Sequence, residues 1–140
     1  PKLRLLRDER VSLSEWDLDI LGIEDVGCTW SRTPLQLPSL ERMARARAQD
    51  RPTLLLSHRP QVFKQAERLG YPLVLSGHTH GGQVALPLFP HINIARLIGY
   101  YDRGWYRWGQ SQLLVSRGVG SSGPALRINC SREIALLEFQ

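Results

Sequence analysis

The sequence of 140 residues predicts an α/β domain, and three observations lead to that prediction. Two continuous apolar runs, at residues 54–56 and 73–75, are typical of strands buried on both faces, because apolar and polar residues do not alternate in them. Between them, Pro60, an apolar stripe at helical spacing and Gly70 predict an amphipathic helix. The hydrophobic content of 42% and the charged content of 22% are ordinary for a soluble globular domain.

The predicted strand–helix–strand unit, residues 52–80, brings the ends of its two strands to the same edge of the sheet. Ligands of open α/β sheets bind at that edge. His58 follows the first strand, and His78 and His80 follow the second. Three imidazoles at one sheet edge predict a metal site, since histidine is a common ligand of zinc, manganese and iron.

The second strand of this unit runs directly into Gly77-His78-Thr79-His80-Gly81-Gly82. If the segment stays extended, His78 and His80 point to one side and Thr79 to the other. Two imidazoles in that arrangement can serve one metal ion or two adjacent ions. A His-x-His in a loop is also common as a solvated pair, so the metal prediction depends on His58 reaching the same edge.

The net charge is +5, almost all of it from arginine. This charge permits a phosphate, a nucleic acid or a membrane surface as partner and does not choose among them. No apolar stretch reaches the roughly eighteen residues that a membrane span needs. Cys28 and Cys130 form no Cys-x-x-Cys, so neither a zinc ribbon nor a redox pair is indicated. The chain starts without Met or a signal-peptide stretch, which indicates a processed chain or a fragment.

Further elements are expected on the N-terminal side of the unit. In order, they are short apolar runs at residues 2–7 and 11–13 around a turn at Asp8-Glu9-Arg10, a strand at 18–23, a loop at 28–38, and a helix at 39–48 capped by Ser39. The acidic pair Glu24-Asp25 ends the strand and could support a metal, although a solvated or turn-capping role is the simpler interpretation. The arginines of the helix are best explained as a solvated face.

The C-terminal part has a different character. In order, we expect a short strand at residues 83–86, a loop at 87–97 in which His91 is structural or exposed, an aromatic and basic strip at 100–108 that turns at 109–111 into a strand at 112–116, a glycine-rich turn at 117–123, and a last strand at 134–139. The strip could also stack nucleobases or lie at a membrane interface, but a hairpin is favoured. The glycine-rich turn lacks the Lys-Ser/Thr ending of a P-loop.

His58, the segment Gly77 to Gln83 and the turn Ser116-Arg117-Gly118-x-Gly120 resemble motifs of the calcineurin-like metallophosphoesterases. The resemblance runs from about Leu3 to Phe139 and is closest to the bacterial branch whose signature reads Leu-Ser-Gly-His-Thr-His-Gly-Gly-Gln. It implies part of a β-sandwich flanked by helices. It also implies that residues 1–140 form a single domain that is the C-terminal half of a larger phosphoesterase domain.

The same resemblance implies a site with two divalent metal ions, of manganese, iron, zinc or magnesium. His58 and His78 match two ligands of one ion, and His80 matches a ligand of the other. Such a pair of ions activates water for attack on a phosphodiester or phosphomonoester. Arg117 is a candidate contact for the phosphate, and its alternative is a surface arginine paired with a carboxylate.

This sequence departs from the family pattern in one respect. The family's Asp-x-His, Gly-Asp-x-x-Asp and Gly-Asn-His-Asp/Glu motifs are absent, and neither Asp25 nor Asp102 stands in such a context. An upstream segment would supply the bridging Asp and the His that protonates the leaving group, so we expect no catalytic residue in this chain. A partner, either the N-terminal half or a second copy, is expected to cover the apolar sheet face left open.

Three functions stay open at this stage. The parent protein is expected to be a hydrolase acting on a phosphate ester. The alternatives are a metal-binding module without catalysis and a module that binds an anionic surface. A membrane surface stays open as partner, nucleic acid is disfavoured, and the expected location is soluble or peripheral to a membrane in a bacterium.

Overall fold

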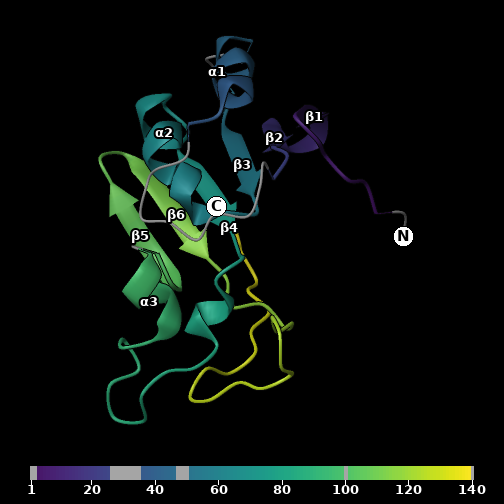
Figure 1. Ribbon diagram of the computed structural model, residues 1–140. Helices are drawn as coiled ribbons and strands as arrows, with labels where there is room; N and C mark the ends of the chain where they lie inside the picture. Colours follow the sequence, from purple (N-terminus) through teal and green to yellow (C-terminus); the bar gives the residue numbers. More distant parts are fainter. Residues whose placement is uncertain (1–2, 26–35, 47–50, 100, 140) are drawn as a thin grey trace.

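The computed structural model describes residues 3–25, 36–46, 51–99 and 101–139, and within them six strands form one sheet (Figure 1). The strands are β1 (Glu9–Leu13), β2 (Leu18–Gly22), β3 (Thr53–Ser57), β4 (Leu73–Ser76), β5 (Gly104–Trp108) and β6 (Ser111–Val115). The helices are α1 (Pro38–Arg45), α2 (Phe63–Arg68) and α3 (Ile94–Ile98), with 3-10 turns η1 (Ser14–Trp16), η2 (Pro60–Val62) and η3 (His80–Gly82). The predicted α/β class is confirmed.

The strand order is β1-β2-β3-β4-β6-β5. The four central strands are parallel, and β1 and β5 pair antiparallel at the two edges. β3, η2, α2 and β4 form the predicted strand–helix–strand unit, and Ser57 lies opposite Ser76 in the register of β3 and β4. Both strands therefore end at the same edge of the sheet, and the residues that follow them start from neighbouring positions.

The core lies between α1, α2 and one face of the sheet. Alternate strand residues point to this face, as the twofold period of a strand requires, and they include Leu55, Val74 and Leu113. Leu40 of α1 and Phe63 of α2 pack against them, and all five of these residues are at most 1% exposed.

The opposite face of the sheet is apolar and less well covered. Leu56 and Leu75 are only half-buried on this face. Residues 4–7 line one cavity together with Leu56 and Leu75, and residues 133–135 line another together with Leu75 and Leu114. Irregular segments from the two ends of the described chain thus lie along this face.

Three sequence-based predictions need correction. Glu9 and Arg10 belong to β1 and not to a turn, since the chain reverses at Asp8, whose φ is 52°. Residues 83–86 form only isolated bridges and no strand. Residues 134–139 have no regular structure, because a strand needs a neighbour to bond with and the described residues provide none. The predicted hairpin is confirmed, with a turn at Gly109 and Gln110 between β5 and β6.

Other predictions fall wholly or partly outside the described residues. The predicted loop at 28–38 lies mostly there, as does Cys28, whereas Cys130 is buried. The predicted helix at 39–48 is observed from Pro38 to Arg45, and residues 47–48 are not described. None of the helices in the described part of the chain combines the length and the apolar character of a membrane span.

Candidate metal centre

His58 and His78 meet at the edge where β3 and β4 end. The His78 Nδ1 and His58 Nε2 atoms lie 3.0 Å apart, and the two rings meet edge to face with centroids 4.8 Å apart. The backbone links the same two loops, because the Gly77 N–H donates to the His58 carbonyl at 3.2 Å. The parallel pairing of β3 and β4 therefore brings together two imidazoles that are twenty residues apart in the sequence.

The segment that follows β4 coils tightly and is not extended, so the prediction that His78 and His80 share one side of a strand is wrong. His78 has a φ of 70° and His80 a φ of 51°, both in the left-handed region. The Thr79 N–H donates to the Gly77 carbonyl at 2.8 Å, and the Gly82 N–H donates to the Thr79 carbonyl at 2.8 Å. Non-glycine residues rarely adopt this backbone conformation, and they concentrate at functional sites when they do.

Gly82 is required at its position for two reasons. Its φ is 84°, and an added Cβ would lie 2.2 Å from Oδ1 of Asn93. Gly81 is similarly enclosed, since a Cβ there would lie 2.7 Å from Sγ of Cys130. The two glycines let the backbone after His80 pass directly against neighbouring side chains.

His80 lies against Gln83 and shares a pocket with His78. Its Nδ1 atom lies 3.3 Å from Oε1 of Gln83, and a pocket of about 170 Å³ is lined by His78, His80 and Gln83 among others. The described residues contain no group of three or more His, Cys, Asp or Glu side chains placed to hold a single metal ion. Within these residues, the structure brings two of the three predicted histidine ligands into contact.

The electrostatic surroundings of His78 favour a neutral ring. Its pKa is lowered to about 4, first by burial and then by the positive charge of Arg59 and the nearby His58. A neutral imidazole keeps a lone pair, which is the form that binds a metal ion. The 3.0 Å between His58 Nε2 and His78 Nδ1 is the distance of a hydrogen bond between the two rings. These two nitrogens are the candidate metal donors of this edge.

The acidic pair after β2 is engaged in ion pairs. Asp25 accepts from Nε of Arg59 at 2.5 Å, and Arg59 is buried, with 6% of its surface exposed. Glu24 is exposed, and its carboxylate lies 3.7 Å from the guanidinium of Arg7. Arg59 lowers the pKa of His78, and the charge of Asp25 opposes this effect by raising it.

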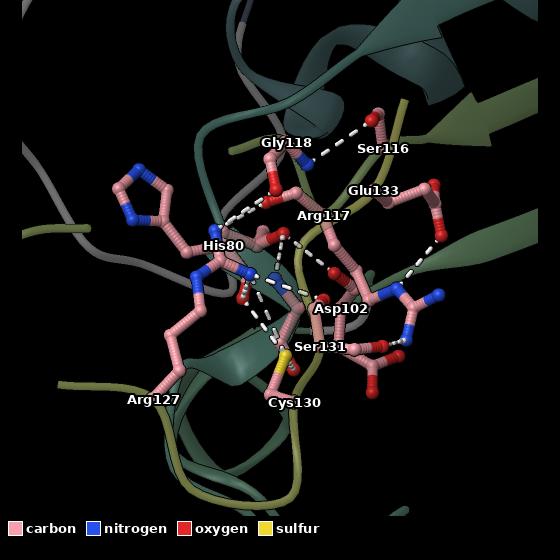
Figure 2. Close-up of polar contacts among 11 residues, drawn as sticks. His80, Asp102, Ser116, Arg117, Gly118, Arg127, Cys130, Ser131 and Glu133 are labelled. Carbon is pink, nitrogen blue, oxygen red and sulfur yellow. Dashed lines mark hydrogen bonds and ion pairs between the residues drawn. The ribbon is translucent and has the colours of Figure 1, made fainter. Parts of the chain in front are cut away.

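Arg117 is partly exposed and joins a polar network with Glu133 and Ser131 (Figure 2). Its Nε donates to Glu133 at 2.7 Å and its Nη1 donates to the Ser131 hydroxyl at 2.8 Å. A partner carboxylate was the alternative to phosphate binding, and the structure places one there. Glu133 and Ser131 thus accept from Nε and Nη1 of Arg117.

Arg127 is a residue that sequence-based reasoning missed. Its guanidinium donates to the carbonyls of Arg117 at 2.7 Å, Gly118 at 3.1 Å and Gly120 at 2.5 Å. The same group reaches the His80 carbonyl at 3.3 Å, to which the Cys130 thiol also donates at 3.1 Å. Arg127 thus ties the glycine-rich turn to the backbone of His80 (Figure 2). No local signal marks it in a chain so rich in arginine.

Asp102 is the second residue that was missed. Its carboxylate, 2% exposed, accepts from Nδ2 of Asn93 at 2.7 Å and from the Tyr106 hydroxyl at 2.5 Å, and it pairs with Arg96 at 3.3 Å. Its carbonyl accepts from the Thr79 hydroxyl at 2.5 Å. Both carboxylate oxygens are therefore occupied, and the residue anchors the loop between the two histidines.

The pKa of Asp102 reflects these contacts. Burial raises it, but hydrogen bonds from Tyr106 and Asn93 and the charge of Arg96 outweigh that effect, so the pKa lies below its usual range. The pKa of Tyr106 is raised, first by burial and then by its hydrogen bond to Asp102. The carboxylate is held in its charged form.

His91 lies outside this arrangement. It is exposed and stands against the ring of Phe89, with the two centroids 6.0 Å apart. The expectation that it is structural or exposed is confirmed.

Comparisons with known proteins find relatives that are named metallophosphoesterase or phosphodiesterase. The chain is 33% identical over 124 residues to an uncharacterized metallophosphoesterase of Campylobacter jejuni, covering 88% of this chain and 32% of the relative. It is 35% identical over 138 residues to metallophosphoesterase YkuE of Bacillus subtilis, covering 99% and 43%. It is 36% identical over 92 residues to phosphodiesterase YaeI of Escherichia coli, covering 63% and 32%.

No protein-family model matches the chain, and no solved structure matches it significantly. The chain spans from about a third to less than half of the length of these relatives. Proteins named for this activity align with most of its residues, and His58 and His78 meet at the sheet edge. The chain therefore belongs to the metallophosphoesterase family.

Proposed function

We propose that this chain forms the histidine-bearing edge of a centre that hydrolyses phosphate esters. The observation that carries the proposal is the approach of His58 Nε2 and His78 Nδ1 to 3.0 Å at the ends of two neighbouring parallel strands. Histidine nitrogens are common ligands of divalent ions. In this proposal His58 and His78 hold one ion, and His80 belongs to a second.

Two divalent ions, of manganese, iron, zinc or magnesium, would supply Lewis-acid catalysis and the activation of water. The residues of this chain contribute binding and orientation. The Gly77 to His58 backbone bond fixes the two loops relative to each other, and Arg59 keeps positive charge beside the pair. Asp102 and Arg127 hold the backbone on either side of His80 through Thr79 and the His80 carbonyl.

We further propose that the chain is the C-terminal half of a larger phosphoesterase domain. The remaining half would bring the bridging Asp and the His that protonates the leaving group. The half-buried sheet face around Leu56 and Leu75 is the surface that this half, or a second copy of the chain, would cover. The name of the YaeI relative favours a diester over a monoester as substrate.

The test uses the full-length protein, manganese and bis(p-nitrophenyl) phosphate. His58→Ala and His78→Ala should each lower kcat/KM at least about a hundredfold and remove bound metal, which isothermal titration measures independently of turnover. His91→Ala is the matched control, because His91 is an exposed histidine away from the pair, and its activity should equal that of the wild type. Full activity in His78→Ala would overturn the proposal.

Arg117 needs a separate test, because its side chain is paired with Glu133. If Arg117 binds the phosphate, Arg117→Gln should raise KM for the diester and leave metal binding unchanged. If it only supports the turn, KM should stay constant while the thermal midpoint falls.

The alternative function is a metal-binding module without catalysis. The observation that favours it is that His58 and His78 meet as a pair, while the described residues contain no group of three or more His, Cys, Asp or Glu side chains that could hold an ion. It predicts that the full-length protein binds metal stoichiometrically and releases no p-nitrophenol.

A further inference from the structure

The segment from Leu86 to Leu97 exposes an unusual amount of apolar surface, and we call it the apolar loop. Leu88 is 85% exposed and Leu97 is 65% exposed. The other exposed large apolar residues in it are Leu86, Phe89, Ile92 and Ile94. Contiguous exposed apolar surface on a folded protein indicates a contact with a partner or a membrane.

Hydrogen bonds hold the backbone of the apolar loop in a defined conformation, so the exposure of its side chains is a property of the fold. The Leu86 N–H donates to the Ile92 carbonyl at 3.1 Å, and the Ile92 N–H donates to the Phe89 carbonyl at 2.8 Å. Asn93 caps α3 by accepting from the Arg96 N–H, and Arg103 donates to the Pro90 carbonyl at 2.6 Å. These bonds close the loop and keep its side chains turned outward.

The charge beside the apolar loop is basic. Between residues 84 and 110 the sequence has a single carboxylate, Asp102, which is buried and paired with Arg96. Arg103 donates to the Pro90 carbonyl of the loop and has no carboxylate partner among the described residues. Trp105 of β5, just after Arg103, is also exposed.

We propose that the apolar loop and the arginines beside it dock on an anionic membrane surface. Aliphatic side chains that enter the acyl boundary, arginines at the headgroup level and a flanking tryptophan are the combination that such a surface binds. Nucleic acid fits less well, because the exposed side chains of the loop are mostly aliphatic and cannot stack on bases. This inference does not depend on the proposed hydrolase activity.

The loop lies next to the candidate metal centre. Ile94 lines the same pocket as His78 and His80, and Gly82 passes directly under Asn93. Docking would therefore bring the sheet edge that carries His58 and His78 close to the lipid headgroups. The apolar face around Leu75 is a different surface, since irregular segments of the chain itself lie along it.

The test is sedimentation of the full-length protein with vesicles of phosphatidylcholine, alone or mixed with phosphatidylglycerol. We expect binding to the mixed vesicles that weakens with added salt. The double variant Leu88→Ser/Phe89→Ser should lower the partition coefficient at least about tenfold, since two apolar side chains no longer enter the membrane. Arg103→Gln should lower it about fivefold on mixed vesicles and leave it unchanged on phosphatidylcholine alone.

Trp16→Ser is the matched control, because Trp16 is equally exposed and lies outside the apolar loop. It should bind like the wild type. The proposal is overturned if the wild type does not sediment with mixed vesicles, or if the double variant binds as well as the control. It is also overturned if the wild type does not bind vesicles and the double variant melts at a lower temperature than the wild type. That result would mean that the rest of the protein covers the loop.

Discussion

Arg127 offers the sharpest single test of how the site is held together. Its guanidinium makes four hydrogen bonds of 3.1 Å or shorter to the carbonyls of Arg117, Gly118 and Gly120, two of them to Gly120. Longer hydrogen bonds reach the carbonyls of His80 and Ser131. Methionine fills a similar volume and can make none of them. Hydrogen bonds to charged groups contribute about 1.5–3 kcal/mol each, but water can replace part of them at this half-buried position. We expect Arg127→Met to cost about 2–3 kcal/mol.

The measurement is urea unfolding of the full-length protein, followed by titration with manganese. Because Arg127 also fixes the His80 backbone, we expect metal affinity to fall about tenfold, as it does when groups that orient a ligand are removed. Arg132→Met is the matched control, since Arg132 is a nearby exposed arginine of the same segment. Equal stability and equal metal affinity in the two variants would refute the role given to Arg127.

Two further predictions concern the loop around His80. Because the pKa of Asp102 is lowered in the folded state, its charged form stabilises the fold above the ordinary carboxyl range, and this contribution is lost as the pH falls toward the lowered pKa. The Asp102→Asn variant should therefore be less stable than the wild type at neutral pH and should lose less stability on acidification. Thermal melts across acidic pH measure this. A midpoint that falls in parallel with that of the wild type would contradict it. Gly82→Ala should destabilise by about 1–3 kcal/mol, since its Cβ meets Asn93 at a positive φ. Gly120→Ala, where a Cβ meets open space, should be neutral, and equal melting of the two variants would exclude the steric argument.

Much of the fold could be predicted from the sequence because the information is local. The uninterrupted apolar runs of β3 and β4 and the stripe of α2 each follow from the period of one element. Parallel pairing then follows from the single helix between the two strands, and with it the meeting of His58 and His78. The incorrect prediction of a strand at residues 134–139 also comes from local information. Its local pattern suits a strand, but strand formation depends on a neighbour that a local pattern does not contain.

The backbone of the His-x-His segment was decided by tertiary structure alone. A strand-like reading of Gly77 to Gly82 is locally reasonable, yet Asp102, Asn93 and Arg127 hold it in a tight coil with His78 and His80 at positive φ. These residues lie between eleven and forty-seven positions away in the sequence from the residues that they contact. By itself, the sequence determined which side chains could bind a metal ion and at which sheet edge they lie. Only the tertiary structure decided which of their atoms face one another, because buried polar groups from distant segments must be satisfied together.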